Sequence, residues 1–118
     1  MGDEGSMDDT IYTSSTVGKR LKRMKKRETL ELLYQGNIIA ITAKITIGRS
    51  RKNNIYVNDN LASRNHALVQ KVKSTYYIKD LDSTNGTSVN DEQIPRGKYV
   101  RLHKGDVVKI GRTEITIH

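Results

Sequence analysis

From Thr29 to the end of the chain, short apolar or alternating segments are separated by clusters of turn-forming residues. At the C-terminal end, isoleucines 115 and 117 occupy one face and threonine 116 the other, as in a half-buried strand. Many short strands with closely spaced turn signals are typical of a β-sandwich or a β-barrel. The expected strands cover residues 30–34, 38–42, 45–47, 55–57, 66–72, 76–81, 87–89, 99–102, 107–110 and 113–117, with a shorter one at 92–94.

Residues 1–28 have a different composition. They are acidic at the start, rich in serine and threonine in the middle, and strongly basic from Lys19 to Arg27. Few large apolar residues are available to offset the entropy of ordering, so we expect a flexible tail followed by one domain at 29–118. Residues 1–6, which precede Met7, resemble a short segment encoded by an expression vector.

Composition narrows the range of functions. The chain has 118 residues, which suits one domain, and 31 of them (12 Ile, 8 Val and 11 Thr) are β-branched. The absence of cysteine excludes disulfides, thiol nucleophiles and cysteine-based metal sites. No apolar run approaches the roughly 20 residues that span a bilayer, and no signal-peptide core is visible, so we expect a soluble, cytoplasmic protein.

The charge points to an anionic partner. The chain carries 21 basic and 13 acidic residues, a net charge of +8, and residues 30–118 alone carry 14 − 8 = +6. Such a balance suits nucleic acid, a membrane surface or a phosphorylated protein, although a cationic surface can also simply aid solubility.

Three separated loops, at residues 48–50, 63–67 and 82–87, carry the most informative polar residues. Together they offer two guanidinium groups, several hydroxyls and an asparagine amide. This set of donors suits a tetrahedral dianion such as phosphate. Each loop alone has a plainer interpretation, because Arg49 could be a solvated cation, Ser63 could start a turn, Asn85-Gly86 could form a hairpin, and His66 could be a polar core residue.

The order of these three loops within a β-rich chain resembles that of the forkhead-associated (FHA) domain family, whose members bind phosphothreonine in other proteins. The resemblance covers roughly three-quarters of the chain, from about residue 29 to 118. It implies a sandwich of two antiparallel sheets with about eleven strands, which holds the peptide with loops at one end. The motifs that carry it are Ile47-Gly48-Arg49, Ser63-Arg64-Asn65-His66-Ala67, Asp80-Leu81-Asp82-Ser83-Thr84-Asn85-Gly86-Thr87, Val89-Asn90, Leu102-His103-Lys104-Gly105-Asp106 and Ile110-Gly111.

The resemblance implies roles for five residues in phosphothreonine binding. Arg49 and Ser63 are expected to contact the phosphate, and Arg64 is expected to add charge. Thr84 is expected beside the phosphate or the peptide, and Asn85 is expected to bond the peptide backbone.

The resemblance also implies that Gly48, His66 and Gly86 shape the binding loops, with His66 bracing them from behind. The family prefers phosphothreonine over phosphoserine, and residues after the phosphothreonine tune specificity. Loop residues 51, 52 and 61 are candidates for that contact. No cofactor or metal is expected, and a Ser/Thr kinase is expected upstream.

The sequence leaves two alternative functions and one added form of regulation open. The basic run at 19–27 would suit a nucleic-acid-binding module, but the sequence lacks an obvious row of aromatics for base stacking, and such binding would weaken steeply with salt. An enzyme is disfavoured, because the three histidines have no metal or triad spacing and no P-loop is present. Phosphorylation of Thr10, Thr13 or Thr16 could dock the tail on its own domain or on a second copy.

Overall fold

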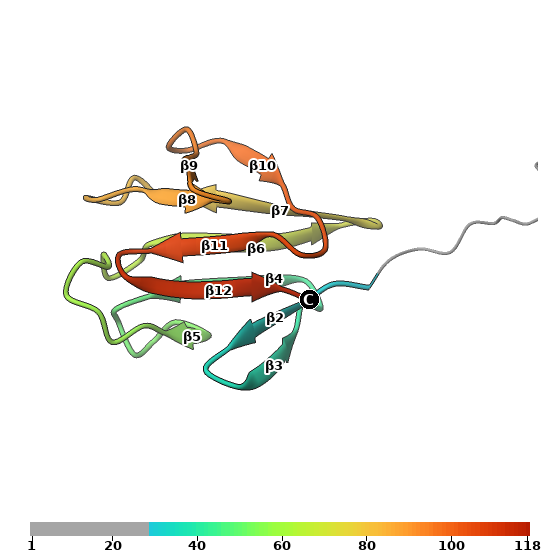
Figure 1. The fold of residues 1–118 in the computed structure, drawn as a ribbon, viewed down its shortest axis with the longest axis horizontal. Helices are drawn as coiled ribbons and strands as arrows, with labels where there is room; N and C mark the ends of the chain where they lie inside the picture. The colour runs from blue at the N-terminus through green and yellow to red at the C-terminus, as the bar shows by residue number, and fades with distance from the viewer. Residues whose placement is uncertain (1–28) are drawn as a thin grey trace, which may run out of the picture.

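The computed structural model describes residues 29–118, which fold into eleven strands arranged as two facing sheets (Figure 1). The predicted tail at 1–28 lies outside the described residues. The strands are β2 (Glu31–Tyr34), β3 (Asn37–Ala40), β4 (Lys44–Gly48), β5 (Ile55–Tyr56), β6 (Ala67–Val72), β7 (Thr75–Asp80), β8 (Thr87–Val89), β9 (Glu92–Gln93), β10 (Tyr99–Arg101), β11 (Val107–Ile110) and β12 (Thr113–Ile117).

Two sheets of five and six strands make up the sandwich. Their orders are β10-β7-β6-β4-β5 and β3-β2-β12-β11-β8-β9. Every strand pair is antiparallel except β4 and β5, where the chain loops round and pairs in parallel, with Ile47 opposite Ile55. The predicted sandwich and strand count are therefore confirmed, and the parallel pair is the one departure from two antiparallel sheets.

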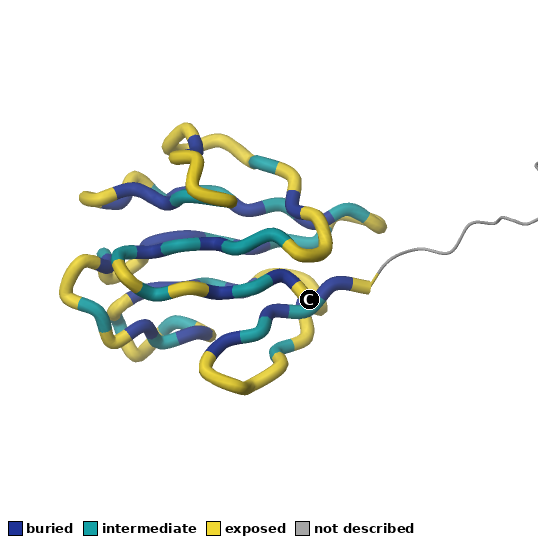
Figure 2. Tube along the Cα trace, viewed as in Figure 1, coloured by how far each residue is buried: buried dark blue, intermediate teal, exposed yellow. Residues whose placement is uncertain are grey.

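The core lies between the sheets and is built from isoleucine, valine, leucine and tyrosine (Figure 2). Strand β7 shows why the sequence folds this way, since Tyr76, Ile78 and Asp80 point inward and are buried while the alternate residues are half-buried. Burial of β-branched side chains on two facing sheets supplies the main stabilising term in a chain that lacks phenylalanine and tryptophan.

The loops gather at the two ends of the sandwich. The loops that follow β4, precede β6 and follow β7 extend to one end, whereas the described N-terminus and the C-terminus lie at the other (Figure 1). No helix that could cross a membrane occurs in the part of the chain that the structure describes.

Candidate functional site

The first two predicted loops lie side by side. The N–H of Arg49 donates to the carbonyl of Ser63 (2.9 Å), and the N–H of Ser50 donates to the carbonyl of Arg64 (3.2 Å). Gly48 permits this approach, because a Cβ added there would collide with the carbonyl oxygen of Arg64. The chain therefore needs glycine at this position to join the two loops.

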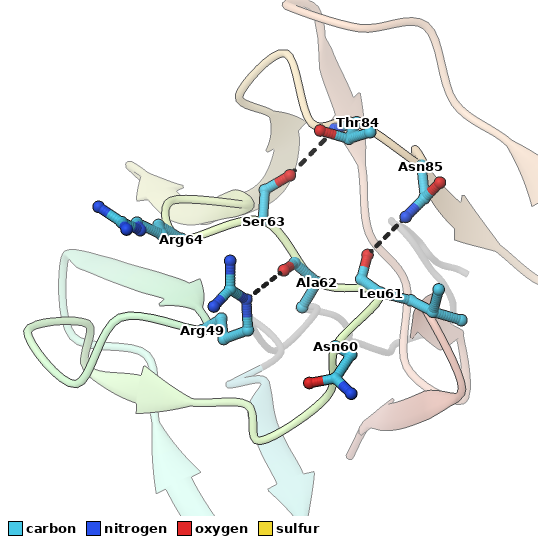
Figure 3. Close-up of a pocket in the computed structure, with 8 residues that line it drawn as sticks. All are labelled: Arg49, Asn60, Leu61, Ala62, Ser63, Arg64, Thr84 and Asn85. Atoms are coloured by element: carbon cyan, nitrogen blue, oxygen red, sulfur yellow. Dashed lines mark hydrogen bonds between the residues drawn. The ribbon is translucent and has the colours of Figure 1, made fainter.

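The third loop closes against the second. The N–H of Thr84 donates to Oγ of Ser63 (3.0 Å), and Nδ2 of Asn85 donates to the carbonyl of Leu61 (2.9 Å) (Figure 3). These two bonds connect residues that are more than 20 positions apart in the chain. They fix the spacing between the Ser63 hydroxyl and the Asn85 amide.

A hollow of about 300 Å³ opens between the three loops. Nε of Arg49 donates to the carbonyl of Ala62 (3.0 Å), which aims the rest of the guanidinium into the hollow (Figure 3). Arg64 lies at the rim, and its side chain extends away from the centre (Figure 3). None of the residues around the hollow is acidic. They are Arg49, Asn60, Leu61, Ala62, Ser63, Arg64, Thr84 and Asn85.

His66 lies fully buried behind the hollow and links two loops. The N–H of Ser63 donates to its Nδ1 (2.9 Å), so this nitrogen must carry a lone pair. The hydrogen-bond network therefore assigns the proton to Nε2, which donates to the carbonyl of Gly86 (2.9 Å). In this neutral form the ring holds both Ser63 and Gly86 in place, which is the geometry of the expected brace.

A buried carboxylate organises the third loop from below. Oδ1 of Asp80 accepts from the hydroxyls of Ser83 and Thr87, both at 2.6 Å, and Oδ2 accepts from the N–H of Ser83 (2.9 Å). Burial opposes the charge on this carboxylate, but the bonds from Ser83 and Thr87 outweigh that effect and hold the pKa of Asp80 below its ordinary value. Asp80 therefore remains an ionised acceptor that fixes the turn before Asn85.

Arg96 supports the same loop and was not found from the sequence. Its Nε donates to the carbonyl of Ser83 (2.9 Å), its Nη2 donates to the carbonyl of Thr84 (3.3 Å), and Nε lies 3.9 Å from Oδ2 of Asp80. Nothing in the spacing marks this residue, since it follows Pro95 in a loop 13 positions beyond Ser83. Only the fold brings it to the back of the site.

The structure brings Arg49, Ser63, Thr84 and Asn85 around one hollow and places Arg64 at its edge. Of the candidates for contacting residues after the phosphothreonine, Leu61 lines the hollow. The guanidinium carbon of Arg51 instead lies 4.6 Å from the ring centroid of Tyr56. The hollow thus offers fixed donors and positive charge, which is what a tetrahedral dianion requires.

Known proteins resemble this chain in sequence or in structure. FhaB of Mycobacterium tuberculosis, an FHA domain-containing protein, is 34% identical over 73 residues, or 62% of this chain and 46% of that protein. EmbR of the same organism, solved with a low-affinity phosphopeptide, is 31% identical with a TM-score of 0.70 over 76% of this chain and 24% of that one. An FHA domain solved in work on phosphothreonine-dependent interactions is 26% identical, with a TM-score of 0.70 over 77% of this chain and 96% of that one.

The chain spans less than half the length of FhaB and about a quarter of EmbR. The FHA domain family model matches residues 45–111, which run from the second residue of β4 to the turn after β11 and include all three loops of the hollow. Since this match covers more than half of the chain, the protein belongs to the FHA domain family.

Proposed function

We propose that this domain is a non-catalytic module that binds phosphothreonine peptides through the hollow between its three loops. The observation that carries the proposal is a guanidinium, a serine hydroxyl and an asparagine amide held around one space with no carboxylate among the residues that line it. Phosphothreonine carries close to two negative charges at neutral pH, because its second pKa is about 6. An acid-free, arginine-bearing hollow favours that dianion over an unphosphorylated threonine.

The hydrogen bonds already present suggest how each donor would act. Because Nε of Arg49 is engaged with Ala62, the two terminal nitrogens of the guanidinium are the ones directed to the phosphate. The Oγ of Ser63 accepts from Thr84, which leaves its own hydrogen to donate to a phosphate oxygen. Each bond to the charged phosphate would contribute about 1.5–3 kcal/mol.

Asn85 would hold the peptide rather than the phosphate. Its Nδ2 already donates to the carbonyl of Leu61, so its Oδ1 remains to accept an N–H of the bound peptide. Arg64 at the rim would add longer-range attraction, and Thr84 would lie against the phosphothreonine. Preference for phosphothreonine over phosphoserine would come from the extra methyl, worth about 1 kcal/mol when a niche fits it.

The test is a titration with an oriented phosphothreonine peptide library, with matched phosphoserine and unphosphorylated peptides. Arg49→Ala should weaken binding at least about tenfold, or 1.4 kcal/mol, and Ser63→Ala should weaken it less. Lys104→Ala removes the same charge from the exposed loop between β10 and β11, which does not line the hollow, and should leave binding unchanged. Normal binding by a folded Arg49→Ala domain would contradict the assignment.

We also propose that the module reads the product of a Ser/Thr kinase in the cytoplasm and that its own tail competes for the site. Phosphate on Thr10, Thr13 or Thr16 would give a tethered ligand, whose effective concentration reaches millimolar values for short flexible linkers. A tail-phosphorylated protein should then bind partner phosphopeptides more weakly than the same protein with all three threonines changed to alanine. Equal affinity of the two proteins would end this proposal.

A further inference from the structure

The outward side of the five-stranded sheet carries a cluster that the phosphothreonine site does not use. Along β4, β6, β7 and β10, inward residues form the core, and the alternate residues face away from the other sheet. We call this surface the outer face. It is formed by Lys44, Thr46, Leu68, Gln70, Val72, Thr75, Tyr77, Lys79, Tyr99 and Arg101.

Tyr99 is held in a fixed position on the outer face although it is 50% exposed. Its strand, β10, lies next to β7, yet its hydroxyl donates to Oε1 of Gln70 on β6 (3.0 Å), so the side chain crosses over β7. Its ring meets that of Tyr77 edge-on, with centroids 6.2 Å apart. An exposed aromatic ring fixed in this way is suited to binding, because little side-chain entropy is lost when a partner docks.

An apolar hollow of about 320 Å³ lies beside the ring, formed by Gln70, Val72, Tyr77 and Tyr99. Val72 is 47% exposed, so two of these residues keep about half of their surface in water. The surface that lines the hollow is mostly apolar, which favours an apolar side chain of a partner.

Positive charge surrounds this hollow. Lys44, Lys79 and Arg101 occupy outward positions, while Lys73 and Lys98 lie in the adjoining turns. Among residues 29–118, none of these five cations lies within ion-pair distance of a carboxylate, and no acidic residue occupies an outward position on the four strands.

The other sheet shows the contrast. There Nζ of Lys109 lies 3.4 Å from Oδ1 of Asp91 and 3.7 Å from Oε2 of Glu114, so its charge is compensated within the domain. The uncompensated charge of the outer face therefore favours a partner that brings carboxylates.

We propose that the outer face is a docking surface for an acidic segment of a partner protein, with one apolar side chain of that segment in the hollow and flanking carboxylates over the lysines. The site goes beyond the proposed phosphothreonine binding and shares no residue with it. Because it lies on the side of the sandwich rather than at the loop end, one partner could occupy both surfaces.

A protein segment fits this surface better than a single-stranded nucleic acid. Stacking of successive bases needs aromatic rings whose flat faces are open. Here Nζ of Lys79 lies 5.0 Å from the ring centroid of Tyr99, and Tyr77 meets that ring edge-on, so the two rings do not form a row of open faces. The apolar hollow beside the rings instead favours an aliphatic side chain such as leucine.

The test uses a fluorescent peptide of alternating aspartate and glutamate with one central leucine, about nine residues long, or roughly 30 Å when extended. Tyr99→Ala and Lys79→Glu should each weaken its binding at least about fivefold. Replacing the central leucine with alanine should do the same. Arg49→Ala should not change its affinity, which separates this proposal from the phosphothreonine site.

Three results would overturn the proposal. They are no detectable binding of the acidic peptide at millimolar concentration, unchanged binding by Tyr99→Ala, or tighter binding of a single-stranded oligonucleotide of equal charge. Tyr99 is half exposed, so the alanine variant is expected to fold, and a thermal melt of each variant checks this directly.

Discussion

Replacing Arg96 with alanine should weaken phosphopeptide binding although this residue does not line the hollow. The change removes the bond to the carbonyl of Ser83 at 2.9 Å and the longer bond to the carbonyl of Thr84 at 3.3 Å. A bond from a charged donor contributes about 1.5–3 kcal/mol when protected from water. The Arg96 side chain is 44% exposed, which reduces the expected loss of stability to about 1 kcal/mol.

Two measurements follow from that magnitude. A loss of about 1 kcal/mol should lower Tm by about 4–8 °C for a domain of this size. Freeing the backbone at Ser83 and Thr84 means that this part of the loop must be ordered again on binding, which should raise Kd about two- to tenfold. Isothermal titration with a phosphothreonine peptide and a thermal melt on the same sample would measure both effects.

Matched variants make the test specific. Arg96→Lys keeps the charge but loses the planar fork, so it should show most of the effect of alanine. Arg112→Ala removes another exposed arginine, whose side chain makes no hydrogen bond within residues 29–118, and should match the wild type. An Arg96→Ala protein with wild-type Tm and wild-type Kd would refute the supporting role of this side chain.

Two further changes probe the buried groups behind the site. His66→Ala leaves the Ser63 N–H and the Gly86 carbonyl without their partners and should lower the free energy of unfolding by about 2–4 kcal/mol, which urea unfolding measures. It should also weaken peptide binding, which a titration measures at a temperature where the variant is still folded. The pKa of Asp80 is lower in the folded protein than in the unfolded chain. The ionised carboxylate therefore contributes its full stabilisation above the unfolded-state pKa of about 3.9, and this contribution is lost as the pH falls through the folded-state pKa. The gap in unfolding free energy between wild type and Asp80→Asn should therefore be constant from pH 7 to 5 and narrow below about pH 4. A pH-independent gap would contradict the assignment.

Much of the fold could be predicted from the sequence because its signals are local. Short apolar or alternating segments bounded by turn residues placed the strands at 87–89, 107–110 and 113–117 at their observed bounds, and the others to within one or two residues. The parallel pairing of β5 could not be predicted in this way, since a two-residue strand after a long loop has no periodicity of its own.

Some residues of the site could be predicted from local sequence in the same way, whereas others could not. The loops that carry Arg49, Ser63 and Asn85 contain distinctive residue combinations, so they could be singled out before their proximity was known. The contacts of His66 and Arg96 join positions 20 and 13 residues apart, and which carbonyl each side chain reaches depends on the strand order. Tyr77 and Tyr99 likewise meet only because β10 pairs with β7, which is why the sequence showed no aromatic cluster.

The most direct test of the phosphothreonine site is an amide and arginine side-chain NMR titration with one phosphothreonine peptide and its unphosphorylated twin. We expect the phosphopeptide to shift the Arg49 Nε–H and the amides of Ser63, Thr84 and Asn85 most strongly, and the unphosphorylated twin to leave them unchanged. Equal shifts with both peptides, or shifts that spare these residues, would contradict a phosphothreonine site formed by the three loops.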